Sequence, residues 1–238
     1  MKNWIGMTLM CGVMAMIGWG CANEKSMTVE NHMVMNSGPI QVEITTPFGT
    51  MVAELFDNTP VHRDNFAKLV REGFYDGLLF HRVIEGFMVQ GGDPNSRGAA
   101  PGTRLGSGGP GYTLEAEMDT SHVHIKGALS AARQGDAANP ERRSSGSQFY
   151  IVQGATYAPD KLANFESRVR ANAPDFSYTA AQQEAYSVSG GTPHLDMQYT
   201  VFGQIVEGLD LVDSIAAVQT ARGDRPLEDV TMFMRILE

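Results

Sequence analysis

Short runs of alternating apolar and polar residues, separated by glycine-rich connections, recur along this chain of 238 residues. Val42 and Ile44 alternate with polar neighbours, Pro47-Phe48-Gly49 indicates a turn, and residues 50–56 continue as the second strand of a hairpin. The last run, 229–237, again places apolar residues at every second position. Many short strands with few helices favour a mainly β chain folded as a closed antiparallel barrel. The other strands are predicted over 78–83, 87–91, 127–132, 148–153 and 199–206.

Two helices are predicted between these strands. Thr59 belongs to the residue types that cap helix N-termini, and Pro60 suits the first helical position. The apolar residues that follow fall three and four positions apart, which places them on one face, and Gly73 is a predicted stop. A second helix is expected near 208–217.

The long connection over about 155–191 is a predicted helical insert. Residues 160–171 show an apolar face at helical spacing, and Thr179 with Gln182 fits a capping box that opens a second short helix. The insert is either a satellite packed on the barrel or a wall of a binding site. The second interpretation rests on its direct continuation into His194 and Leu195.

Composition and motifs exclude several classes of function. The formal net charge is −9 and no Lys/Arg cluster stands out, so nucleic acid is not an expected partner. Residues 106–111 match G-x-G-x-x-G, but Pro110 lies inside the match and no apolar strand precedes it, which argues against a dinucleotide site. His122 and His124 would share one face of a strand without a third ligand at suitable spacing. We therefore predict a solvated histidine pair and no metal site.

The N-terminus has the pattern of an export signal. Lys2 precedes an uncharged run over 4–20, and the run ends at Gly20-Cys21, which resembles the cleavage site of bacterial lipoproteins, although Gly18 stands where a Leu-like residue is usual. An ordinary cleaved signal peptide and an uncleaved anchor remain alternatives. We predict a signal peptide over 1–20, a lipidated Cys21 with a flexible tether over 21–38, and a folded domain over 39–238.

This pattern predicts a lipid anchor in the membrane of a bacterial cell envelope. The outer membrane, facing the periplasm, is favoured over the inner one, because no Asp follows Cys21. Loss of Cys11 with the signal would leave the domain without a free thiol, which suits an oxidising compartment.

Three blocks carry the chemistry of the chain. Residues 80–93 place Arg82, Phe87, Met88 and Gln90 close together, which offers a cationic hydrogen-bond donor beside apolar side chains, with neither a nucleophile nor a set of metal ligands. Such a site can hold a peptide and bias a bond rotation, but it is poorly equipped to break a bond. The other two blocks are Gly146-Ser147-Gln148-Phe149-Tyr150-Ile151 and Tyr199-Thr200-Val201-Phe202-Gly203.

In this order and spacing, the blocks resemble those of the cyclophilin-type peptidyl-prolyl cis-trans isomerases, from about Ile40 to the C-terminus. The resemblance implies an eight-stranded antiparallel barrel with a helix over each open end, and isomerase activity on X-Pro bonds without a cofactor. It also implies that Arg82 donates a hydrogen bond to the prolyl nitrogen, with Gln90 and Phe87 as the other catalytic residues. The implied substrate-binding residues are Met88, Ala132, Arg133, Gln148, Phe149, Tyr150, His194, Leu195 and Tyr199.

Four of these positions depart from the pattern of the family. His194 stands where the animal-type members have Trp, a position associated with tight cyclosporin binding, so weak binding of that drug is expected. Tyr199 stands where they have His, and Arg133 where Asn is frequent. Tyr150 replaces a frequent Phe, and its hydroxyl would need a partner or a place at the pocket edge.

Two other functions are compatible with the same residues. The expected enzyme is a monomer that acts on proline-containing segments of exported proteins and so assists their folding. One alternative is a chaperone or scaffold that binds proline segments, with incidental turnover. The presence of Arg82 with Gln90 favours catalysis over this alternative. The other alternative makes the insert a docking element for a membrane partner.

Overall fold

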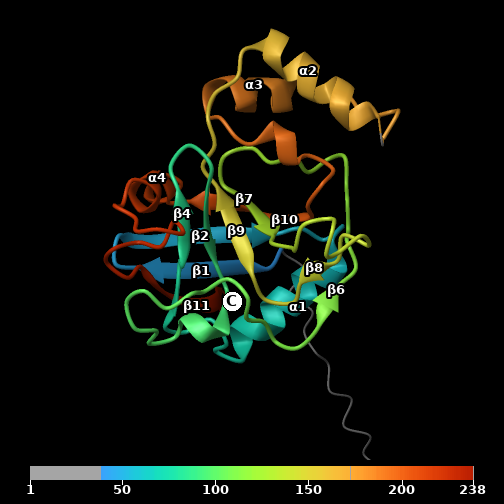
Figure 1. The fold of residues 1–238 in the computed structure, drawn as a ribbon. Helices are drawn as coiled ribbons and strands as arrows, with labels where there is room; N and C mark the ends of the chain where they lie inside the picture. Colours follow the sequence, from blue (N-terminus) through green and yellow to red (C-terminus); the bar gives the residue numbers. More distant parts are fainter. Residues whose placement is uncertain (1–38, 172, 238) are drawn as a thin grey trace, which may run out of the picture. The chain divides into compact units, whose positions relative to one another are not determined.

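The computed structural model describes residues 39–171 and 173–237 (Figure 1). The predicted signal peptide and tether, including Cys21, lie outside the described residues. Among the described residues, no helix has both the length and the apolar character needed to cross a membrane.

Nine strands of the described chain form one antiparallel sheet. They are β1 (Gln41–Thr46), β2 (Gly49–Leu55), β3 (Leu78–Leu79), β4 (Arg82–Ile84), β5 (Met88–Gly91), β7 (Ala128–Ala131), β9 (Phe149–Val152), β10 (Val201–Glu207) and β11 (Thr231–Leu237). Their order in the sheet is β3-β11-β1-β2-β10-β7-β9-β5-β4. The predicted mainly β, antiparallel fold is therefore confirmed.

The strands at the two ends of the sheet, β3 and β4, follow one another in the sequence. Only Phe80 and His81 separate β3 from β4, yet β3 pairs with β11 and β4 pairs with β5. The prediction of one continuous strand over 78–83 is therefore wrong. Counted as one broken strand, β3 and β4 bring the total to the eight strands expected. Among the described strands no hydrogen-bonded ladder joins β3 to β4, so the sheet is a curled half-barrel.

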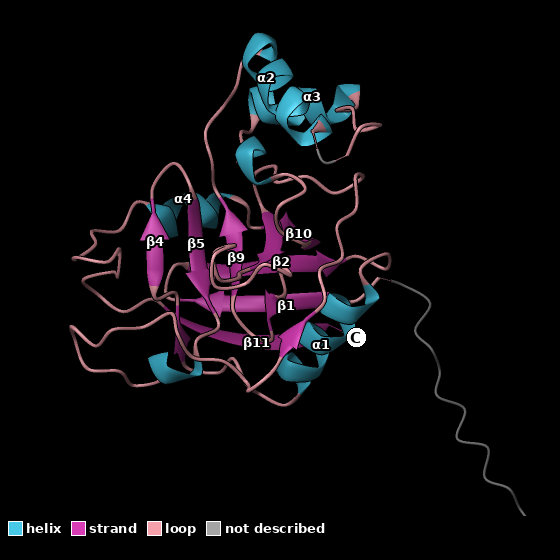
Figure 2. Cartoon of the chain, turned by 45° about the vertical axis from the view of Figure 1, so that its right-hand side comes forward, coloured by secondary structure: helices cyan, strands magenta, loops and turns pink. Residues whose placement is uncertain are grey.

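Two helices pack on the curled sheet. Helix α1 (Pro60–Arg71) lies against β10 and β11, and α4 (Asp210–Ala216) lies against β2, β4 and β5 (Figure 2). The rings of Phe66, Tyr75 and Phe149 meet within the core at centroid distances of 5.0 to 5.6 Å. Gly73, at φ +66°, ends α1 as predicted, because the left-handed conformation is easy only for glycine.

The N-terminus of α1 is capped differently from the prediction. Thr59 makes no side-chain cap, and its hydroxyl donates instead to the Phe56 carbonyl at 3.3 Å. The carboxylate of Glu117, far away in sequence, accepts from the amides of Val61 and His62 at 3.0 and 2.9 Å. A third bond of 2.6 Å joins the Glu117 carboxylate to Nδ1 of His62. Glu117 therefore fastens the loop before β7 to α1.

The predicted insert contains the two helices expected, α2 (Pro159–Arg170) and α3 (Ala180–Val188). The capping box of Thr179 and Gln182 is present at the start of α3. In Figures 1 and 2 the two helices stand at one end of the sheet. They share a small core in which Leu162, Phe176 and Tyr186 pack with Val123 from the barrel side.

Four short elements were not predicted. Strands β6 (Thr113–Leu114) and β8 (Ser144–Ser145) pair with each other, and two 3-10 turns lie at Pro94–Ser96 (η1) and Pro193–Leu195 (η2). Elements of two or three residues leave too little periodicity to be recognised in a sequence.

Candidate active site

The structure gathers most of the predicted site residues around one pocket of about 100 Å³. Its walls come from strands β4, β5 and β9, the turn before β5, the segment after β7, and η2 with the residues that follow it. Apolar and aromatic side chains line the pocket together with two arginines and one amide. The lining residues are Arg82, Phe87, Met88, Gln90, Ala132, Arg133, Tyr150, Leu195 and Tyr199.

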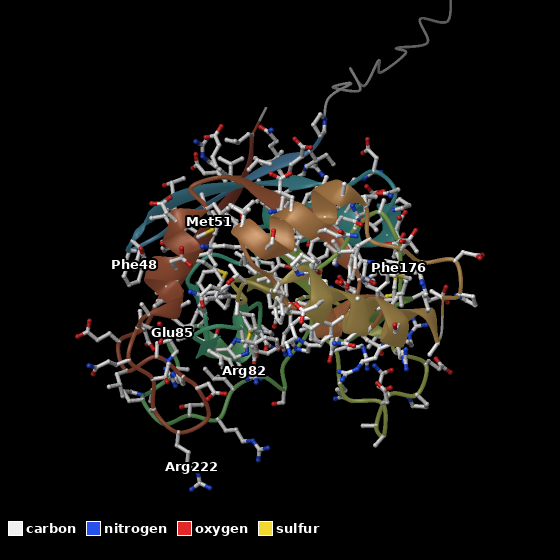
Figure 3. The ribbon with its side chains drawn as sticks, turned by 90° about the horizontal axis from the view of Figure 1, so that it is seen from above. Phe48, Met51, Arg82, Glu85, Phe176 and Arg222 are labelled. Atoms are coloured by element: carbon white, nitrogen blue, oxygen red, sulfur yellow. The ribbon has the colours of Figure 1, made fainter. Side chains whose placement is uncertain are left out.

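Arg82 lines this pocket with a side chain that is 40% exposed, and Figure 3 labels it beside the segment that carries β4 and β5. Its Nη1 donates to Oε1 of Gln90 at 3.4 Å, and its Nε donates to Oδ2 of Asp224 at 3.3 Å. Gln90 lies directly opposite Arg82 in the β4–β5 pairing. Within the described residues no bond engages Nη2, so this nitrogen can donate to a bound peptide.

The amides form a chain that continues away from Arg82. Nε2 of Gln90 donates to Oε1 of Gln148 at 3.1 Å, and Nε2 of Gln148 donates to the Gly108 carbonyl at 2.7 Å. Each glutamine is held by its neighbour, which fixes the direction in which Oε1 of Gln90 points. The chain also ties the glycine-rich loop over 106–111 to the pocket.

A stacked pair of rings stands beside the pocket. Phe87 lines the pocket, and His194 of η2 stacks on it with 5.7 Å between the ring centroids. Burial lowers the pKa of His194 below its ordinary value. The ring is therefore neutral near pH 7, which suits an apolar contact.

Arg133 covers another side of the pocket. Its Cζ lies 4.5 Å from the centroid of the Tyr199 ring, within the range of a cation–π contact. Nε donates to the Gln198 carbonyl at 3.0 Å, and Nη1 donates to Oδ1 of Asp136 at 2.6 Å. The guanidinium is thus engaged with the protein on several sides, and it holds Tyr199 in place.

Tyr150 has the buried partner that its hydroxyl requires. The hydroxyl lies 3.0 Å from Nε2 of His124, and Nδ1 of His124 lies 2.9 Å from Oδ1 of Asp196. His124 and Asp196 are both buried. Burial also raises the pKa of Tyr150, so the hydroxyl keeps its proton and can donate.

The structure contradicts two predictions about the site. Phe149 was expected to bind substrate, but adjacent residues of a strand face opposite sides, so Tyr150 faces the pocket and Phe149 packs in the barrel core. His122 and His124 were expected to be a solvated pair. His124 is instead buried, while His122 stacks on Phe56 at 3.8 Å and bonds Asn58.

Three residues that support the site were not predicted from the sequence, Asp224, His124 and Asp196. Asp224 lies in a loop 142 residues from Arg82, and no local pattern marks it. The sequence gives a weak indication of the other two, because His124 belongs to the His-x-His pair and Asp196 directly follows the pocket residue Leu195.

A larger hollow of about 710 Å³ adjoins the pocket and shares Gln90, Ala132 and Arg133 with it. It runs along the glycine-rich loop and reaches Asn139 and Arg143. A peptide held in the small pocket would extend its flanking residues into this space. The described residues contain no group of three or more His, Cys, Asp or Glu side chains that could hold a metal ion.

The sequence and the fold both have counterparts among known proteins. The family model for cyclophilin type peptidyl-prolyl cis-trans isomerases matches residues 40–234. A Staphylococcus aureus (strain USA300) protein with the provisional name peptidyl-prolyl cis-trans isomerase is 36% identical over 202 residues, which cover 83% of this chain and 91% of that protein.

A longer relative comes from Streptococcus pyogenes serotype M6 and carries the provisional name of a bifunctional phosphatase and peptidyl-prolyl cis-trans isomerase. It is 40% identical over 210 residues, which cover 85% of this chain but only 38% of the relative.

Two solved structures share the fold. A Cryptosporidium parvum cyclophilin matches with a TM-score of 0.59 at 23% identity, and covers 84% of this chain and 99% of its own. A structure of the same protein with the dipeptide Ala-Pro matches with a TM-score of 0.57 at 23% identity, over 83% of this chain and 99% of its own. The curled sheet is thus a cyclophilin-like fold. From its sequence match over 40–234, the chain belongs to the cyclophilin-type peptidyl-prolyl cis-trans isomerase family.

Proposed function

We propose that this isomerase acts on X-Pro bonds of exported proteins from a lipid anchor in the bacterial cell envelope. The observation that carries the catalytic part is Arg82, a permanent cation that lines the pocket beside apolar and aromatic side chains and whose Nη2 bonds no described residue. Proline-containing segments of polypeptides are the proposed substrates, and the chain assists their folding as a monomer.

The chemistry follows from the nature of the prolyl amide. Rotation about the C–N bond meets a barrier of about 18–20 kcal/mol, because the nitrogen lone pair is shared with the carbonyl. A donor aimed at that nitrogen competes for the lone pair and so favours the twisted bond over either planar form. The ring of the proline occupies the pocket between Phe87 and Tyr150, and Gln90 holds the backbone.

The proposed location rests on the N-terminal sequence alone. The uncharged run over 4–20 followed by Cys21 supports export and lipidation, with the outer membrane facing the periplasm favoured. Fractionation of cells that express the full chain tests this part. A Cys21→Ala variant should leave the membrane fraction, whereas equal membrane recovery of both forms would contradict lipidation.

The enzyme is distinguished from a proline-binding module by one pair of measurements. The wild type should accelerate isomerisation of a short X-Pro peptide, and Arg82→Ala should lower kcat/KM roughly tenfold or more, a loss of at least about 1.4 kcal/mol of barrier lowering. Arg82→Lys keeps the charge and loses the rigid fork, so it should recover only part of the activity. Unchanged peptide affinity together with unchanged function of Arg82→Ala in cells would favour the binding module.

A further inference from the structure

The buried carboxylate of Asp196 connects the insert to the pocket. Its Oδ2 accepts from the hydroxyls of Tyr178 and Tyr186 at 2.5 and 2.7 Å, and both tyrosines belong to the insert. Its Oδ1 accepts from the backbone amide of His124 at 2.8 Å and from Nδ1 of the same residue at 2.9 Å. Both oxygens are therefore saturated by donors from two different parts of the fold.

These contacts determine which proton each group carries. Burial raises the pKa of Tyr178 and Tyr186, so both hydroxyls are neutral donors to the carboxylate. Because Oδ1 of Asp196 is an acceptor, Nδ1 of His124 carries a proton. The neutral form of this ring then accepts at Nε2 from the hydroxyl of Tyr150, 3.0 Å away.

Tyr150, the last residue in this series of hydrogen bonds, lines the pocket proposed to hold the proline ring. Tyr150 is 5% exposed, and its ring forms part of the pocket wall with Leu195 and Tyr199. Leu195 directly precedes Asp196, so the same carboxylate also anchors the segment that carries this wall. Asp196 is 1% exposed, and each of its carboxylate oxygens accepts two hydrogen bonds. Burial of a carboxylate is costly, so these bonds are needed to keep it inside the fold.

We propose that Asp196 is a positioning residue of the isomerase, through which the insert over 155–191 sets the place of Tyr150 in the substrate pocket. Tyr178 and Tyr186 hold the carboxylate, the carboxylate orients His124, and His124 fixes the Tyr150 hydroxyl and ring. The inference extends the proposed isomerase function, but it concerns how the pocket is shaped and not the step at the prolyl nitrogen.

A double-mutant cycle in the full chain tests this coupling. The variants are Tyr186→Phe, Tyr150→Phe and the two combined, with kcat/KM for a short X-Pro peptide and the Kd of that peptide as readouts. Phe keeps the ring in each case, so a single hydroxyl is lost at each position. We expect Tyr186→Phe alone to lower kcat/KM and weaken peptide binding by roughly three- to tenfold, the range for mutations that act through a chain of contacts.

If the two tyrosines are coupled, the effects of Tyr186→Phe and Tyr150→Phe on kcat/KM and Kd should not add. In the Tyr150→Phe background, where the pocket end of the series is already cut, Tyr186→Phe should change both readouts by less than about twofold. The melting temperature should fall by a similar amount in both backgrounds, because the carboxylate loses the same donor in each. A merely structural role of the insert predicts the opposite, an equal loss of activity in the two backgrounds.

Two further variants keep the test decisive. Tyr178→Phe replaces Tyr186→Phe in the cycle if the latter fails to fold, since both hydroxyls bond the same oxygen. Tyr157→Phe is the matched control, because Tyr157 packs on Phe165 of the insert and its hydroxyl has no bond to any described residue. Additive losses, or no loss for either tyrosine, would overturn the proposal. A wild type that binds the peptide without isomerising it would refute the proposed function, while the affinity cycle would still test the coupling.

Discussion

Asp224 accepts a hydrogen bond from Nε of Arg82 at 3.3 Å, and so holds the guanidinium through a different nitrogen from the one that bonds Gln90. The backbone of the same residue is fixed as well, since its carbonyl accepts from the Val83 amide at 2.8 Å. Asp224 adopts φ +62°, a conformation that Asn also tolerates. The cation that we propose to be catalytic is therefore oriented by a loop that lies far from it in the sequence.

Asp224→Asn should lower kcat/KM by about two- to fivefold, because an exposed ion pair contributes at most about 1 kcal/mol. The loss should appear without a change in melting temperature, since the backbone contact to Val83 remains. Asp64→Asn is the control, because it removes a carboxylate that pairs with Arg63 on the surface of α1. Equal activity of Asp224→Asn and the wild type would show that Gln90 alone orients Arg82.

Glu117→Gln should destabilise the fold by removing the charged acceptor from the start of α1. Lost helix caps and bonds to charged groups cost about 1–3 kcal/mol, which urea denaturation would measure as a lower free energy of unfolding. Thr59→Val is the comparison, since the Thr59 hydroxyl makes no cap and donates only to the Phe56 carbonyl. It should cost less than half as much, and a larger cost for Thr59→Val would contradict the assignment of Glu117 as the cap.

The fold should lose stability as the pH falls below the ordinary histidine pKa of 6.5. Burial lowers the pKa of His62, His81, His122 and His194 in the folded state. The unfolded chain therefore binds more protons than the folded chain between those lowered values and 6.5, so the free energy of unfolding decreases through that window.

Melting temperatures between pH 5 and 8 would check this sign. His81 is the sharpest single test, because both its ring nitrogens are buried without a partner among the described residues. His81→Asn should flatten the pH dependence. A stability that rises on acidification would contradict the prediction.

Cyclosporin should inhibit this isomerase weakly, and His194→Trp should increase the affinity by roughly tenfold or more, equivalent to about 1.4 kcal/mol. The physical reason is that the indole ring of Trp offers a larger apolar surface than the exposed imidazole that stacks on Phe87. Inhibition curves for the two proteins would measure the change. His122→Trp, at a partly buried histidine that does not line the pocket, is the control and should leave inhibition unaltered.

Several features were predictable because they depend on local chemistry. The hairpin of β1 and β2, the stop of α1 at Gly73 and the capping box at Thr179 each rest on residues close together in the chain. The pocket-lining residues were predictable for a different reason, since the three blocks of sequence resemble a known family. The predicted cap of α1 was wrong because a residue distant in sequence takes the place of the local one. Glu117, and not Thr59, accepts from the first amides of the helix.

By itself, the sequence determined the mainly β fold, the two helices of the insert and the inventory of the pocket, because periodicity, turn chemistry and motif spacing are written in consecutive residues. Only the tertiary structure decided that β3 and β4 are separate, that Phe149 faces the core, and that His124 is buried. It also decided which acidic residues bond the side chains of the site. Asp224 meets Arg82 and Asp196 meets His124 across 142 and 72 residues, and pairings at such separations arise only when the curled sheet brings its loops together.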